Sequence, residues 1–191
     1  MTVNSESEST VLRLWLLLPR ISDTLALCQD SIFSKYGITT EQWRVLACIK
    51  SRGALRPTDL ASILERSPNS LSMLLDRMVK AGLIRRKRDK KDRRTVFVSM
   101  TDKAKKVVEP AVIEGWEFMH ELLSPLSYDD QRALASMLET IKCKLTGYLN
   151  PEMDMAEIIK NSFTKDPDLY KRMVKNVLPP GYEAKRKRRQ R

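Results

Sequence analysis

The sequence is poor in the residues on which enzymes and metal sites depend. It has a single histidine, and its three cysteines (Cys28, Cys48 and Cys143) are far apart and lack CxxC spacing. A Gly-rich phosphate loop and a cluster of metal-ligating residues are also missing from it. We therefore expect no enzyme, no cofactor and no metal site. An odd number of scattered cysteines also gives no disulfide framework, which favours a reducing cytoplasm.

Long hydrophobic runs are missing as well. The most apolar stretch, residues 11–21, is interrupted by Arg13 and Pro19 and is too short to cross a bilayer. It follows an acidic, Ser-rich segment, residues 1–10, which is the wrong flank for a signal peptide. The sequence therefore predicts a cytoplasmic protein without a membrane partner, in which residues 1–10 form a disordered leader.

Basic residues, by contrast, are abundant. The 191 residues include 35 Lys and Arg against 24 Asp and Glu, which gives a formal net charge of +11. Such a charge predicts an anionic partner, although composition alone leaves DNA, RNA and an anionic membrane open. Two segments concentrate the charge: residues 83–94, with eight basic and two acidic side chains, and residues 185–191, with six basic and none acidic.

The spacing of apolar residues predicts a mainly helical protein with one small β-hairpin, an α+β fold. A long first helix from about Leu12 to Gly37 precedes a second helix capped by Thr39 or Thr40. A short third helix begins at Pro57, where proline suits a first turn. Two long helices are expected at about 101–123 and 127–149, and two weaker ones at 153–163 and 169–178.

The clearest local signal is a helix that begins with Ser67 as its cap and Pro68 in its first turn, and ends at Gly82. Its apolar residues recur at helical spacing and should face the core. Its other face carries small polar groups, one thioether and one arginine, which can bind base edges, thymine methyls and phosphate. We assign to DNA binding Ser67, Pro68, Asn69, Ser70, Ser72, Met73 and Arg77. An ordinary solvent-facing helix is the alternative, but such faces usually carry more Glu and Lys.

From Leu83 the apolar period changes to two, which predicts strands at 83–87 and 95–99 around a basic turn. A solvated charged turn is the alternative for this segment. Directly after a candidate recognition helix, however, it resembles a wing that inserts Arg or Lys into a narrow minor groove. The residues of the turn assigned to DNA are Arg88, Lys90, Lys91, Asp92, Arg93 and Arg94. Residues 39–100 thus predict a winged helix-turn-helix.

These residues resemble the MarR family of winged-helix regulators. The family's wing reads D-x-R, then alternating apolar residues, then L-T-x-x-G; residues 92–104 follow this pattern with Met100 and Ala104 in place of Leu and Gly. The similarity continues at residues 60–61, 71–78 and 82–84, and the helix order matches from about 12 to 149. The resemblance implies that Arg94 enters the minor groove and that Asp92 holds the wing by pairing with basic side chains.

The resemblance also implies a homodimer, built from the long helices of residues 11–38 and 101–150 that flank the winged helix. One winged-helix core cannot cover the apolar faces of three long helices, which independently favours a partner subunit. A two-fold dimer predicts a pseudopalindromic operator in double-stranded DNA. We expect a transcriptional regulator, a repressor by the commoner behaviour of the family. The rival is a winged-helix protein-interaction module without sequence-specific DNA binding, which would not require a basic wing beside a small polar helix face.

Many members of this family respond to small phenolic or lipophilic effectors, and some sense oxidants through a cysteine. The aromatic candidates for an effector site are Trp15, Trp43, Trp116 and His120. Core packing is the alternative for each of them. Cys28 lies late in the first helix, whereas the oxidant-sensing cysteine lies near its start. The extension, residues 151–191, is outside the resemblance, and its basic tail either solubilises the chain or adds nonspecific phosphate contacts.

Overall fold

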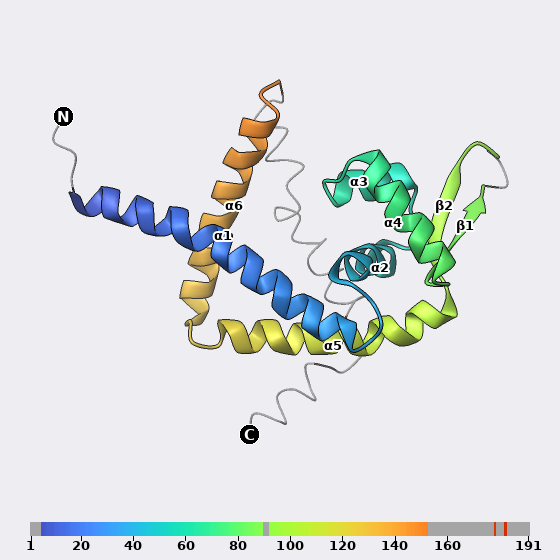
Figure 1. The fold of residues 1–191 in the computed structure, drawn as a ribbon, viewed down its shortest axis with the longest axis horizontal. Coiled ribbons are helices and arrows are strands. Elements are labelled where there is room, and N and C mark those ends of the chain that lie inside the picture. Colours follow the sequence, from blue (N-terminus) through green and yellow to red (C-terminus); the bar gives the residue numbers. More distant parts are fainter. Residues whose placement is uncertain (1–4, 90–91, 153–177, 179–181, 183–191) are drawn as a thin grey trace. The chain divides into compact units, whose positions relative to one another are not determined.

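The computed structural model describes residues 5–89, 92–152, 178 and 182 (Figure 1). Within these residues the elements, in chain order, are α1 (Ser5–Ser34), α2 (Thr40–Arg52), α3 (Pro57–Ile63), α4 (Pro68–Lys80), β1 (Ile84–Arg88), β2 (Val96–Met100), α5 (Asp102–Leu123) and α6 (Tyr128–Leu149). This is the mainly helical fold with one antiparallel hairpin that the sequence predicts. The helices expected at 153–163 and 169–178 and the basic tail at 185–191 lie outside the described residues, apart from Leu178.

The chain divides into two compact units. The first comprises residues up to 49 together with residues 53–111, and the second comprises residues 50–52 together with those from 112 onward. The first unit contains α1, most of α2, α3, α4, the hairpin and the start of α5. The second contains the last three residues of α2, the rest of α5 and α6. None of the helices in the described ranges is long and apolar enough to cross a membrane.

Helix α1 begins earlier than the sequence indicates. It starts at Ser5, so residues 5–10 are helical, and our prediction of a disordered leader over 1–10 was wrong for them. Glu6 and Glu8 lie in the first turn, where the positive end of the helix dipole stabilises acidic side chains. The hydroxyl of Thr10 also donates to the carbonyl of Glu6, at 3.0 Å.

The junction of α1 and α2 is tightly capped. Thr39 forms a capping box: its hydroxyl oxygen accepts from the Gln42 N–H (3.2 Å), and the Gln42 amide oxygen accepts from the Thr39 N–H (3.0 Å). The alternative cap, Thr40, has a different role. Its hydroxyl and its N–H both donate to Oδ1 of Asp30 in α1, at 2.5 and 3.2 Å, and so join the two helices.

The core of the first unit fixes the orientation of α4. The largest of the fully buried side chains come from α1, α2, α3, α4, the hairpin and the start of α5: Phe33, Val45, Leu46, Leu60, Leu71, Leu75, Met78, Ile84, Val98 and Val108. Each such aliphatic side chain contributes about 1.5–3 kcal/mol through its burial. Leu55, before α3, pairs with Val98 through two backbone hydrogen bonds (3.1 and 2.8 Å) and so ties the helix-turn-helix to the hairpin.

In the second unit, α6 is capped by Ser127, whose hydroxyl oxygen accepts from the Asp130 N–H at 3.2 Å. The side-chain amide of Gln131 donates to the carbonyls of Leu123 and Leu126, both at 3.0 Å, which fixes the turn between α5 and α6. No residue of α6 is buried, although one side of it is rich in large apolar residues. Pro110 does not interrupt α5, which continues through it as one helix.

Candidate nucleic-acid interface

Both ends of helix α4 are fixed by local hydrogen bonds. At its start the Ser67 hydroxyl oxygen accepts from the Ser70 N–H at 3.3 Å, and Pro68 occupies the first turn, where its missing N–H costs nothing. At its end Gly82 has a φ of 70°, and the N–H groups of Gly82 and Leu83 donate to the carbonyls of Val79 and Met78, each at 2.9 Å. This Schellman motif requires a left-handed residue, which explains the glycine.

The inner face of α4 decides what its outer face presents. Leu71, Leu74, Leu75 and Met78 are buried, with at most 4% exposure. The seven DNA-binding candidates predicted on this helix are all exposed: Ser67, Pro68, Asn69, Ser70, Ser72, Met73 and Arg77. Met73 is 67% exposed, which leaves a flexible apolar side chain among small polar groups. The first turn also has no acidic residue, so the positive end of the helix dipole is not neutralised there.

The hairpin pairs Ile84 with Met100 and Arg88 with Val96 in antiparallel register. Both strands therefore lie one residue later than the sequence predicts, because Leu83 belongs to the cap of α4 and Thr95 to the turn. The wing turn, residues 89–95, is closed by the Asp89 N–H, which donates to the Thr95 carbonyl at 2.9 Å. Arg88, Arg93 and Arg94 are exposed, whereas Lys90 and Lys91 lie outside the described residues.

Asp92 stabilises the wing turn through hydrogen bonds. Its carboxylate accepts from the backbone N–H of Arg94 (3.0 Å) and from the hydroxyl of Thr95 (2.8 Å). These two bonds, that of the Thr95 hydroxyl above all, lower the pKa of Asp92 below its ordinary value. The resemblance implied ion pairs with basic side chains, but within the described part of the chain the contacts of Asp92 are these hydrogen bonds. A carboxylate this close to a backbone N–H two residues on forms an Asx-turn, which needs no cation.

Three further contacts hold the wing and the start of α5 against the end of α4. Nη1 of Arg86 in β1 lies 2.6 Å from a carboxylate oxygen of Asp76 in α4. The Thr101 hydroxyl donates to the Gly82 carbonyl at 2.7 Å, and the Lys103 ammonium donates to the Ala81 carbonyl at 2.9 Å. Sequence reasoning missed these residues. The dipole of α4 favours a lysine such as Lys103 at its carboxyl end. The partners in these three contacts are, however, 10 to 22 positions apart, so no local sequence pattern predicts them.

The four aromatic effector candidates are divided between the two units of the chain, with Trp15 and Trp43 in the first and Trp116 and His120 in the second. Trp43 stacks on Phe33 in the first unit, with ring centroids 4.7 Å apart, and its indole Nε1 is buried without a hydrogen-bond partner among the described residues. Trp116 and His120 contact each other edge to face in the second unit (5.4 Å), and Trp15 is 76% exposed on α1. In the part of the chain that the structure describes, no group of three or more His, Cys, Asp or Glu side chains could hold a metal ion.

Comparison with known proteins connects this arrangement with a regulator family. The sequence model of the MarR family matches residues 38–96. The chain is 30% identical over 128 residues to the HTH-type transcriptional regulator PecS of Dickeya dadantii, an alignment that covers 65% of this chain and 77% of that one.

Solved structures resemble the chain over most of their own length. A mutant MarR from E. coli complexed with operator DNA has a TM-score of 0.63 at 24% identity and covers 73% of this chain and 99% of that one. The S. aureus MepR–DNA complex has a TM-score of 0.62 at 25% identity and covers 68% and 94%. The fold of the chain is therefore that of the winged helix-turn-helix.

Proposed function

Since the chain belongs to the MarR family of winged helix-turn-helix transcriptional regulators, which are not enzymes, we propose that it is a repressor that binds a specific site in double-stranded DNA as a homodimer. The observation that carries the proposal is the outer face of α4, rigidly oriented by its buried side chains and flanked by a basic wing. The relatives solved with DNA support the same use of the fold. The proposal includes a cytoplasmic location, where the DNA that the protein binds would be accessible.

Helix α4 supplies the base contacts in this proposal. A helix fits the major groove, and the amide of Asn69, the hydroxyls of Ser70 and Ser72 and the guanidinium of Arg77 can bond base edges or phosphates there. Met73 suits a thymine methyl. The wing supplies Arg94 for the minor groove, with Arg88, Lys90, Lys91 and Arg93 for phosphates. Asp92 contacts no DNA and shapes the turn.

Exposed apolar side chains support the homodimer. Those on α1 are Val11, Leu12, Leu14, Trp15, Leu16, Leu17, Leu18, Ile21 and Leu27, and those on α6 are Tyr128, Leu134, Met137, Leu138, Ile141, Leu145, Tyr148 and Leu149. A soluble monomer rarely exposes so many large apolar residues on a single helix. A second copy of the chain would cover them through residues 11–38 and 101–150, and its two-fold symmetry would require a pseudopalindromic operator.

A small phenolic or lipophilic effector that releases the DNA is the regulatory part of the proposal. Trp43 is the best supported candidate, because a buried indole N–H without a partner can donate to a ligand oxygen. Trp15, Trp116 and His120 belong to the proposal only as further aromatic contacts. Operator binding with and without phenolic compounds tests this part of the proposal. The compounds should weaken operator binding by the wild type and have less effect on the Trp43→Phe variant.

Selection of duplexes from a random pool by the purified protein tests the main proposal. We expect a pseudopalindromic consensus, two chains per site and binding that weakens steeply with salt, because each neutralised phosphate releases a counterion. One chain per site would contradict the homodimer. Failure to enrich any sequence would contradict sequence-specific binding and favour the protein-interaction module.

A further inference from the structure

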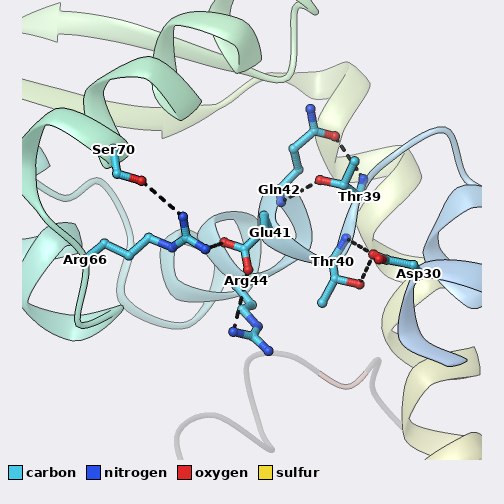
Figure 2. A network of polar contacts seen from close by, with 8 residues as sticks. All are labelled: Asp30, Thr39, Thr40, Glu41, Gln42, Arg44, Arg66 and Ser70. Carbon is cyan, nitrogen blue, oxygen red and sulfur yellow. Dashed lines mark hydrogen bonds and ion pairs between the residues drawn. The ribbon is translucent and has the colours of Figure 1, made fainter. Parts of the chain in front are cut away.

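One arginine connects the first turn of α2 with the first turn of α4. Arg66 lies in the turn between α3 and α4, and its Nη2 forms an ion pair with a carboxylate oxygen of Glu41. Its Nη1 donates to the hydroxyl oxygen of Ser70 at 3.3 Å (Figure 2). Two different nitrogens of one planar guanidinium thus contact Glu41 and Ser70. The carboxylate of Glu41 therefore fixes the direction in which the Arg66 guanidinium donates to Ser70.

The carboxylate end of this network is itself anchored. Glu41 directly follows Thr40, which is bonded to Asp30 of α1, and precedes Gln42, which completes the capping box with Thr39 (Figure 2). The side chains of Arg66 and Glu41 are 32% and 36% exposed, so both are partly shielded from water. Arg44 is more exposed, at 51%, and contacts the other Glu41 oxygen at the longer distance of 3.7 Å.

The contact with Arg66 restricts what the Ser70 hydroxyl can do. A serine hydroxyl has one hydrogen to donate and two lone pairs that accept. One lone pair accepts from Arg66, and the adjacent positive charge makes the approach of a second N–H donor unfavourable. Among the described residues the hydroxyl hydrogen of Ser70 has no acceptor, so it is available on the exposed face of α4. A hydrogen bond accepted from a cation strengthens the bond that the same hydroxyl donates.

We propose that Arg66 is a positioning residue for base recognition: held by Glu41, it fixes Ser70 as a hydrogen-bond donor, so that Ser70 selects an acceptor in the major groove. The acceptors there are N7 and O6 of guanine, N7 of adenine and O4 of thymine, whereas the amino groups of cytosine and adenine are rejected. The inference rests on the proposed function, in which α4 occupies the major groove.

The test measures binding of the full chain to duplexes in which every base pair of one selected half-site is substituted in turn. The variants are Ser70→Ala, Arg66→Met and the double variant, because methionine keeps an apolar stem and removes the donors and the charge. Ser70→Ala and Arg66→Met should lower discrimination at the same base pair, by roughly fivefold for one hydrogen bond. The double variant should lose no more than Ser70→Ala, since both changes remove one interaction.

Two matched substitutions separate positioning from general stabilisation. Arg44→Met removes the other arginine beside Glu41, and should leave discrimination unchanged. Arg66→Lys keeps a charge and donors and should restore part of the discrimination lost in Arg66→Met at unchanged thermal stability. Should Arg66→Met fail to fold, Glu41→Gln tests the same point, because a neutral amide holds the guanidinium less firmly and should reduce discrimination at that same base pair.

Several results would overturn the inference while leaving the proposed function intact. If Arg66→Met weakened all duplexes equally and reduced the salt dependence by about one phosphate contact, Arg66 would itself bind phosphate. If Glu41→Gln strengthened binding to every duplex, Glu41 would be a competitor for that phosphate contact. Additive effects of Ser70→Ala and Arg66→Met at different base pairs would also contradict it. Failure of the wild type to select any duplex overturns the proposed function itself, and the inference with it.

Discussion

Helix α4 and the wing turn both present polar and basic side chains to solvent, but they are held by different interactions. The orientation of α4 depends on buried apolar side chains such as Leu71 and Leu75, which are 1% and 0% exposed. The wing turn has no such anchor among its described residues, and its shape depends on the hydrogen bonds of Asp92. An ion pair between Arg86 and Asp76 links β1 to α4.

This difference suits the two tasks proposed for the regions. Base reading in the major groove needs side chains at fixed positions, which a packed helix provides. Insertion into a minor groove of variable width needs a long side chain on a turn that can adjust. The two regions should therefore respond differently to mutation: changes beneath α4 should affect folding, and changes in the wing turn should affect binding.

The largest effect is expected from Leu75→Ala, directly beneath α4. The side chain is fully buried, so its truncation leaves a cavity and should destabilise the fold by about 2–5 kcal/mol. Val79→Ala is the matched control in the same helix, because Val79 is 39% exposed and its truncation should cost about 0.5 kcal/mol or less. Chemical denaturation of both variants measures the difference. Equal losses would show that packing does not hold α4.

Arg94→Ala should have the opposite profile. The side chain is exposed, so stability should stay unchanged, while operator affinity should fall by about 1–3 kcal/mol for one groove contact. The loss should be greatest on sites with narrow A·T-rich flanks. Binding titrations beside thermal melts measure both quantities. Arg93→Ala, one position away, is the control and should cost less, with no dependence on the flanks.

Gly82→Ala should destabilise the end of α4 by about 1–2 kcal/mol, since an L side chain at a φ of 70° is strained. A Cβ there would meet only the Lys103 side chain at 3.9 Å, so the cost is conformational and not steric. Gly82→Asn should cost less, because asparagine tolerates this region. Denaturation midpoints compare the two, and a smaller loss for alanine than for asparagine would contradict the assignment.

The smallest effect concerns pH and the wing turn. Because hydrogen bonds from Thr95 and Arg94 lower the pKa of Asp92, the carboxylate stabilises the turn above the ordinary aspartate pKa of about 3.9. That contribution is lost as pH falls through the lowered pKa of the folded state. Asp92→Ala should therefore differ slightly from the wild type in stability near neutral pH and converge with it in acid, and its affinity should fall less than that of Arg94→Ala. A difference that grew in acid would contradict this account.

Local signals in the sequence predicted the caps well. Ser67 bonds the N–H three positions later in the structure, and Thr39 does the same within its capping box. Such contacts lie within one helical turn, so residue type and spacing suffice to predict them. The start of α1 was missed because acidic and Ser-rich residues are compatible with a helix start as well as with disorder.

Contacts between distant segments could not be predicted in this way. Glu41 and Arg66 are 25 positions apart, and Arg86 and Asp76 are paired only because the chain turns back at Gly82. The role of Asp92 was predicted in general terms, as support for the wing, but its hydrogen bonds to the Arg94 N–H and the Thr95 hydroxyl were not foreseen, because a backbone N–H carries no signature in the sequence. Whether the predicted site residues touch DNA stays a prediction.

The most direct test of the division between α4 and the wing turn is a base-by-base specificity profile. Binding of the wild type, Asn69→Ala and Arg94→Ala would be measured on operators substituted at every base pair. Asn69→Ala should flatten preference within the half-sites, where α4 reads the major groove, and Arg94→Ala should flatten it only at the A·T-rich flanks. Full affinity and an unchanged flank preference in Arg94→Ala, or the same altered positions in both variants, would contradict the account.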